Sequence, residues 1–207
     1  MKLYLSSFRL GNNPERLGKL LSANKKAAVI VNAIDDETPE IRKEKLEREF
    51  ADFQTLGIQT EELDLRNYFE KTDELKEKLS QYGMVWVRGG NTFILNRAFF
   101  YSGFDELIKQ KRPDKEFVYA GYSAGICVLA PSLKGLDVVD DPHVVPDGYK
   151  PKIIWEGLNL LNYVIEPHYR SDNFESEMIE KEIQYCIDNK ILFKALRDGE
   201  VIIEEIK

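Results

Sequence analysis

Short apolar runs alternate with amphipathic segments along the chain. Residues 27–31 are apolar throughout, as expected of a strand covered on both faces, while residues 40–56 carry an apolar stripe at helical spacing. We predict strands at residues 3–6, 27–31, 58–65, 84–87, 117–120 and 163–165, and helices at residues 40–56, 73–79, 92–100, 104–111, 126–130 and 173–189. Residues 192–196 and 201–206, which flank a turn at Asp198, predict a C-terminal hairpin.

This repeated β–α alternation predicts an α/β fold, a doubly wound and mostly parallel sheet with helices on both faces. The chain has 207 residues, of which 43% are hydrophobic and 31% charged, a composition typical of a globular domain. We therefore expect a single domain over residues 1–207, and we exclude a disordered chain and a small disulfide scaffold.

The net charge and the cysteine content limit which partners and which cellular compartment we expect. A net charge of −7 leaves no basic face for nucleic acid, and no stretch is apolar enough to span a membrane. Cys127 and Cys186 form no metal-binding spacing, so we expect buried thiols in a reducing compartment and no metal site. The apolar N-terminal run is too short for a secretion signal, and we predict a cytoplasmic protein.

Residues 121–125, Gly-Tyr-Ser-Ala-Gly, fit the pattern of a nucleophile elbow between a strand and a helix. In this context Ser123 is exposed at the sheet edge, and the Ala124 amide points to where an oxyanion forms. The alternative interpretation is a plain strand-to-helix turn with a serine N-cap. The apolar strand before and the apolar helix after favour the elbow.

A serine nucleophile needs a base, and the chain has only two histidines. His143 lies in a loop rich in Asp, Pro and Gly, whereas His168 follows a strand that ends at a proline. We therefore predict His168 as the base. A carboxylate should orient it, and spacing alone leaves Asp137, Asp198 and Glu166 open among 36 acidic residues.

A second glycine turn, residues 88–92, also joins a strand to a helix. Its Gly90 amide is a candidate second oxyanion donor, and Asn91 is a candidate substrate-binding residue. The turn lacks the spaced glycines and the Lys-Ser/Thr pair of nucleotide-binding loops, which argues against a phosphate site. The alternative is a simple tight turn in which glycines tolerate unusual dihedral angles.

Three motifs together, Gly-Gly-Asn-Thr-Phe at 89–93, the elbow at 121–125 and Pro-His-Tyr at 167–169, resemble the α-aspartyl dipeptidase (dipeptidase E) and cyanophycinase family of serine peptidases. The resemblance implies a fold like that of class I glutamine amidotransferases and a peptidase without a cofactor. It implies Ser123 as nucleophile, His168 as general base, and an oxyanion hole from the Gly90 and Ala124 amides.

The two branches of that family place the third residue differently. The dipeptidase branch has an aspartate some fifteen positions after the serine, which matches Asp137 if one residue is missing here. The cyanophycinase branch uses a later acidic residue, near Asp198. Both stay open, and we slightly favour Asp137.

The resemblance implies a small acidic peptide as substrate, cleaved after an N-terminal aspartate. Arg88 stands where relatives commonly have a further glycine, Tyr122 where they commonly have Trp or Thr, and Arg170 follows the Pro-His-Tyr motif. Because a guanidinium binds a carboxylate well, Arg88 and Arg170 are candidate substrate-binding residues, with surface arginines as the alternative. Other hypotheses are a cyanophycinase-like or other acyl or isopeptide hydrolase, and a non-catalytic relative. A monomer and a homodimer are both compatible with the sequence.

Overall fold

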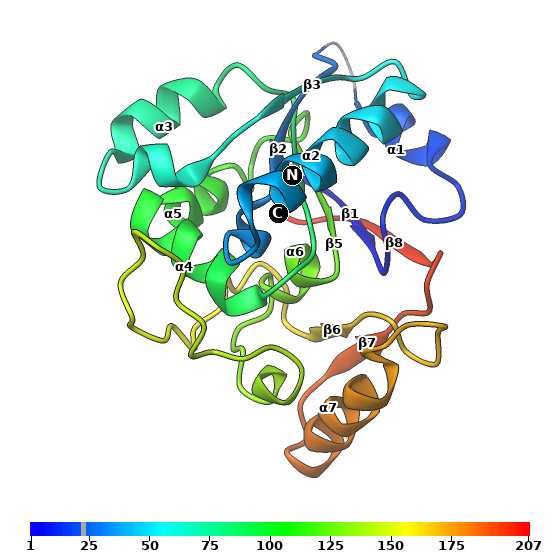
Figure 1. Ribbon diagram of the computed structural model, residues 1–207. Helices are drawn as coiled ribbons and strands as arrows, with labels where there is room; N and C mark the ends of the chain where they lie inside the picture. Colours follow the sequence, from blue (N-terminus) through cyan, green and yellow to red (C-terminus); the bar gives the residue numbers. More distant parts are fainter. Residues whose placement is uncertain (22–23) are drawn as a thin grey trace.

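The computed structural model describes residues 1–21 and 24–207. Its main sheet has six strands in the order β3-β2-β4-β5-β1-β8 (Figure 1). All neighbours run parallel except β8, which pairs antiparallel with β1. The strands are β1 (Lys2–Ser6), β2 (Lys26–Ile30), β3 (Gln59–Glu62), β4 (Met84–Val87), β5 (Val118–Tyr122) and β8 (Val201–Glu205). The predicted α/β fold with a mostly parallel sheet is confirmed.

Helices cover both faces of this sheet, each over its own apolar core. One core joins the sheet to α1 (Glu15–Leu20) and α2 (Pro39–Gln54) through side chains such as Leu17 and Phe53. The other core lies under α3 (Thr72–Leu79), α4 (Thr92–Ser102), α5 (Phe104–Gln110) and α6 (Ala124–Cys127). The central strands β4 and β5 are buried along their whole length, which explains their continuous apolar sequence.

The two C-terminal strands are present but do not pair with each other. β7 (Phe193–Ala195) runs parallel to β6 (Val164–Glu166) in a separate small sheet, beside α7 (Ser176–Asp188), whereas β8 adds to the edge of the main sheet at β1. The segment predicted as a hairpin therefore connects the small sheet to the main sheet. The turn that carries Asp198 connects them, and this places Asp198 near the ends of both β1 and β6.

Several short elements were not predicted. These are α1 and the 3₁₀ helices η1 (Asn32–Ile34), η2 (Leu65–Tyr68) and η3 (Leu136–Val138). They are too short to show a period, and α1 buries only Leu17. Among residues 1–21 and 24–207, no helix has the length and apolarity needed to cross a membrane.

Candidate active site

Ser123 occupies the sharp turn between β5 and α6, with φ 51° and ψ −123°. A positive φ at a non-glycine residue costs roughly 1–3 kcal/mol and persists only where the surroundings impose it. Here the fully buried strand β5 precedes the turn, and the amides of Ile126 and Cys127 donate to the Ser123 carbonyl at 2.8 and 3.0 Å. The strained turn predicted by the sequence pattern is therefore present.

The glycines around Ser123 are required by close backbone approach. A Cβ on Gly121 or Gly125 would collide with the backbone carbonyl of Val87, on the neighbouring strand β4. A Cβ on Gly89 would lie 2.7 Å from the Ser123 Cβ and 3.1 Å from its Oγ. The glycine turn after β4 and the elbow after β5 thus form one packed unit, as expected of neighbouring strands that end at the same sheet edge.

The turn at residues 88–92 presents its backbone to the same edge. Gly90 has φ 144°, and its Cα packs against the Ala33 carbonyl, which also accepts from the Asn91 amide at 2.8 Å. Within residues 1–21 and 24–207, the Gly90 and Ala124 amides donate to no protein acceptor. Both donors are therefore available to an oxyanion.

The Asn91 side chain forms hydrogen bonds with the backbone of its own chain. Its Oδ1 caps α4 by accepting from the Phe93 and Ile94 amides at 2.9 and 3.0 Å. Its Nδ2 donates to the Asp141 carbonyl at 2.9 Å. Because these contacts occupy the amide, the geometry favours a capping role over the predicted substrate-binding role.

His168 lies just after β6, is 2% exposed and has φ 60°. Its Nδ1 is 2.7 Å from Asp198 Oδ1, and its backbone amide donates to Ser7 Oγ at 2.8 Å. The Ser7 hydroxyl donates in turn to Asp198 Oδ1 at 2.9 Å. Since a carboxylate only accepts, Nδ1 carries the proton in this pair and Nε2 is left as a base.

Asp137 lies elsewhere. It is exposed in η3, where its Oδ1 accepts from the Gly135 amide at 3.2 Å, and the described residues show no contact between it and His168. The preference for Asp137 over Asp198 therefore does not agree with the geometry. The reason is the turn between β7 and β8, which brings Asp198 against the His168 ring although it lies 30 positions later in the chain.

The other open candidates also lie away from the imidazole. Glu166 is fully buried, where it accepts from Cys186 Sγ at 3.4 Å and packs against Glu182. Burial raises the pKa of Glu166 to about 7, and the pKa of Glu182 rises in the same direction. His143 is exposed in its loop.

Neither predicted substrate-binding arginine is a free cation at this site. The Arg88 guanidinium is buried beneath the elbow, where its Nε lies 3.3 Å from Glu49 Oε1. The exposed Arg170 donates to Glu180 at 3.1 Å and lies over the Tyr169 ring. The geometry thus does not support the predicted direct substrate contact by either arginine.

A carboxyl group that the sequence did not indicate faces the other ring nitrogen of His168. Glu175 Oε2 lies 3.6 Å from Nε2, and its side chain is 20% exposed. Burial, with smaller contributions from the charges of Asp140 and Asp198, raises the pKa of Glu175 to about 7. Asp140 accepts from the Thr92 amide at 2.8 Å, and burial raises its pKa to about 6. No spacing rule could have selected either residue from so many acidic positions.

An aromatic side chain lines the site next to the imidazole. Phe8, after β1, packs edge-on against the rings of Tyr122 and His168, each at 5.9 Å between centroids, and remains 40% exposed. The ring offers an apolar surface beside the imidazole.

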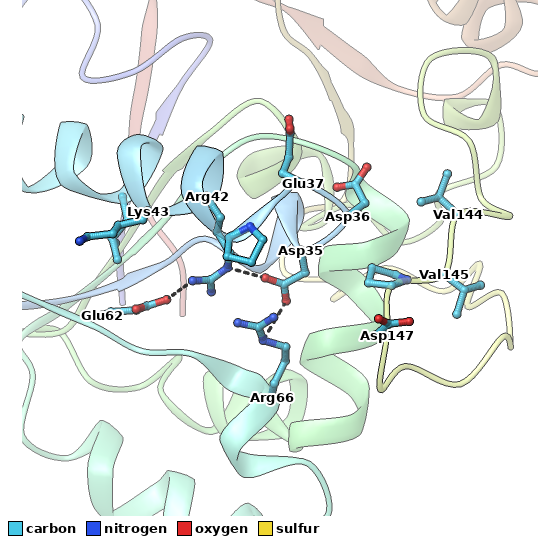
Figure 2. A pocket seen from close by; sticks show the side chains of 13 residues that line it. Asp35, Asp36, Glu37, Arg42, Lys43, Glu62, Arg66, Val144, Val145 and Asp147 are labelled. Carbon is cyan, nitrogen blue, oxygen red and sulfur yellow. Dashed lines mark hydrogen bonds and ion pairs between the residues drawn. The ribbon is translucent and has the colours of Figure 1, made fainter.

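A cavity of about 570 Å³ opens beyond η1, at the carboxyl ends of β2 and β3. Figure 2 shows Arg42 between Asp35 and Glu62, with Arg66 paired to Asp35. These ion pairs occupy both guanidinium groups. Among the described residues, no group of three or more His, Cys, Asp or Glu side chains is arranged to hold a metal ion.

Comparison with known proteins places this arrangement in a family. The model of peptidase family S51 matches residues 13–205, nearly the whole chain. The chain belongs to peptidase family S51. This membership confirms the resemblance drawn from the three sequence motifs.

Individual relatives of this S51 chain are distant. It is 29% identical over 122 residues to an uncharacterised peptidase of Listeria monocytogenes and 31% over 121 residues to one of Pasteurella multocida. These matches cover 59% and 57% of this chain, and 56% and 54% of the relatives, so the chain spans about half the length of the curated relatives it matches.

Solved structures confirm the fold of the S51 chain. A crystal structure provisionally described as a peptidase E protein from Listeria monocytogenes EGD-e has a TM-score of 0.73 at 22% identity, covering 100% of this chain and 98% of its own. A peptidase from an acI-B1 actinobacterium has a TM-score of 0.72 at 16% identity, covering 99% and 83%. At these identities the likeness supports the architecture alone.

Proposed function

We propose that this S51 protein is a serine peptidase of small peptides, with Ser123 as nucleophile and His168 as general base. The observation that carries the proposal is the strained Ser123 turn, packed against Gly89, together with the His168–Asp198 pair, which bonds to Ser7 at the carboxyl end of β1. In the proposed site Asp198 orients the imidazole. The Gly90 and Ala124 amides bind the oxyanion, and no cofactor takes part.

The reaction proceeds through an acyl-enzyme. Ser123 Oγ attacks the scissile carbonyl carbon while His168 Nε2 takes its proton, and the negative charge moves onto the carbonyl oxygen. The tetrahedral intermediate collapses, the C–N bond breaks, and Nε2 gives the proton to the leaving amine. Water then attacks the ester carbonyl and gives a proton to Nε2. As the ester C–O bond breaks, Nε2 passes that proton to Ser123 Oγ and the acid is released.

The test of the nucleophile is Ser123→Ala with and without a fluorophosphonate reagent. We expect the wild-type protein to be labelled stoichiometrically at Ser123 and to hydrolyse Asp-X dipeptides. The variant should lose both properties while its melting temperature stays unchanged. Undiminished cleavage by Ser123→Ala would exclude Ser123, and an unlabelled, inactive wild-type protein would favour a non-catalytic relative.

For the substrate, we propose dipeptides with an N-terminal aspartate, which the family resemblance supports. A second candidate is cleavage beside a basic residue, as in a cyanophycinase-like isopeptide hydrolase. The observation that favours it is the carboxyl group of Glu175 beside His168, on which the charge of Asp140 also acts, while Arg88 and Arg170 are ion-paired elsewhere. Comparing kcat/KM for Asp-Leu with that for β-aspartyl-arginine decides between them.

A further inference from the structure

The imidazole of His168 lies between two carboxyl groups. Asp198 Oδ1 is 2.7 Å from Nδ1, and Glu175 Oε2 is 3.6 Å from Nε2. The Glu175 backbone is fixed because its amide donates to Asn173 Oδ1 at 3.0 Å. Asn173 Nδ2 lies 3.0 Å from Nδ1 as well, but the shorter contact with an acceptor-only carboxylate places the Nδ1 hydrogen toward Asp198.

This arrangement makes two lone pairs face each other unless one more proton lies between them. With its hydrogen on Nδ1, the neutral ring directs a lone pair from Nε2, and an ionised Glu175 would direct another lone pair toward it. The charged groups that act on Glu175 from neighbouring elements, Asp140 and Asp198, are both acidic. Within the described residues no lysine or arginine forms an ion pair with Glu175. A proton shared between Glu175 and Nε2 therefore relieves the repulsion, in agreement with the raised pKa of this carboxyl.

That shared proton interferes with the proposed chemistry. Nε2 accepts the Ser123 proton only if its lone pair is free, and a proton on Nε2 or a carboxylic acid donating to it removes that lone pair. In the described residues the Ser123 hydroxyl makes no hydrogen bond to His168.

We propose that Glu175 recognises a cationic group of the substrate, an ammonium or a guanidinium next to the scissile bond, and that this cation replaces the shared proton and frees Nε2 for Ser123. The displaced proton passes to solvent, so the charge beside the ring is the same before and after binding. Glu175 is then a specificity-determining residue that couples binding to activation. The inference rests on the proposed function and adds to it a required feature of the substrate.

Two sources can supply the cation. In a dipeptide it is the α-ammonium group of the N-terminal residue, whereas in a longer substrate it is a basic side chain. Both satisfy a half-buried carboxylate by a charge-assisted hydrogen bond. Three peptides with the same aspartyl scissile bond separate them: Asp-Leu, N-acetyl-Asp-Leu and N-acetyl-Asp-Arg.

The test compares wild type with Glu175→Gln, which keeps the shape of the side chain but removes its charge and its proton. Glu177→Gln is the matched control, because Glu177 is exposed at the start of α7 and pairs with no other described side chain. We expect wild type and control to prefer a cationic peptide over N-acetyl-Asp-Leu by about 10- to 100-fold in kcat/KM, the range of a hydrogen bond to a charged group. Glu175→Gln should lose this preference, and Glu175→Asp should retain part of it.

The pH profile gives a readout that a merely structural role would not change. With N-acetyl-Asp-Leu, which brings no cation, kcat/KM of wild type should fall below about pH 7 as Glu175 holds its proton, and in Glu175→Gln this acid limb should move to lower pH. A Glu175→Gln variant that keeps the wild-type preference, or that loses activity equally on all three peptides, would overturn the inference. If wild type neither hydrolyses any peptide nor labels at Ser123, the proposed function itself fails, and the inference with it.

Discussion

The contact between Asp198 and His168 gives the sharpest prediction about the proposed mechanism, because it separates two aspartates that the sequence left open. In Asp198→Asn the side chain keeps its shape, but its charge is lost and its amide can donate to Nδ1. The imidazole then carries its hydrogen on Nε2, where it cannot take the Ser123 proton. We expect a large fall in kcat with little change in KM.

The size of the fall follows from the charge that develops on the ring. At an effective dielectric constant of about 20, unit charges 2.7 Å apart interact by about 6 kcal/mol, and since 1.36 kcal/mol corresponds to tenfold in rate, this sets an upper limit of about 10⁴-fold. The Asp198 side chain is 26% exposed, so solvent screening weakens its interaction with the charged ring. We therefore expect kcat to fall by about 10²- to 10⁴-fold, up to the limit given above.

The assay is steady-state hydrolysis of Asp-Leu by Asp198→Asn and by Asp137→Asn, with thermal melting of both to exclude unfolding. Asp137 is exposed, and within the described part of the chain its side chain accepts only from the Gly135 amide, so its variant should stay within about twofold of wild type. The reasoning is refuted if Asp137→Asn loses activity while Asp198→Asn keeps it.

Three further changes probe the surroundings of the site. The raised pKa of Glu182, beside Glu166, implies that the folded state holds a proton that the unfolded state releases above about pH 4.5. The wild-type protein should therefore lose stability as pH rises from 5 to 8. In thermal melts at these two pH values, Glu182→Gln should show a smaller loss. Arg88→Ala should cost about 3–5 kcal/mol in urea unfolding, because it leaves the Glu49 charge buried and unpaired, while the relative kcat/KM values of the peptide panel stay unchanged. Gly89→Ala would place a Cβ 2.7 Å from the Ser123 Cβ, and a displaced nucleophile should lower kcat by about 100-fold with KM retained.

Much of the fold could be predicted from the sequence because its buried strands leave a strong local signal. Met84–Val87 is a strand with the predicted bounds, and the helix predicted at 173–189 corresponds to Ser176–Asp188. The sequence predicted that the two C-terminal strands pair with each other, whereas β7 pairs with β6 and β8 pairs with β1. Two short strands around an Asp-Gly turn are typical of a hairpin, and only the free edge of β1 and the presence of β6 direct them to different sheets.

The residues of the candidate site also differ in whether the local sequence could indicate them. Ser123 and Gly90 lie in local turns whose shape depends on neighbouring residues, so the residue pattern alone indicated them. Asp198 and Glu175 reach His168 only through the tertiary arrangement of the small sheet and α7, and no sequence spacing encodes that. Local motifs therefore indicate the proposed nucleophile and base, whereas the tertiary structure brings the two carboxyl groups to that base.

Two departures from the family pattern, Arg88 and Tyr122, form one feature of the structure. Both reach Glu49 of α2, a residue that is 1% exposed: the Tyr122 hydroxyl donates to Oε1 at 2.8 Å, Arg88 Nε lies 3.3 Å from the same atom, and Trp86 Nε1 donates to Oε2 at 2.9 Å. A buried carboxylate is tolerated when cations and donors surround it in this way. The cluster ties the glycine turn and the elbow to one helix, so Arg88 and Tyr122 help to hold the turn that carries Ser123 in position. Neither residue is then free to bind the proposed substrate, and our proposal assigns recognition to the side chains beside the imidazole, Glu175 and Phe8.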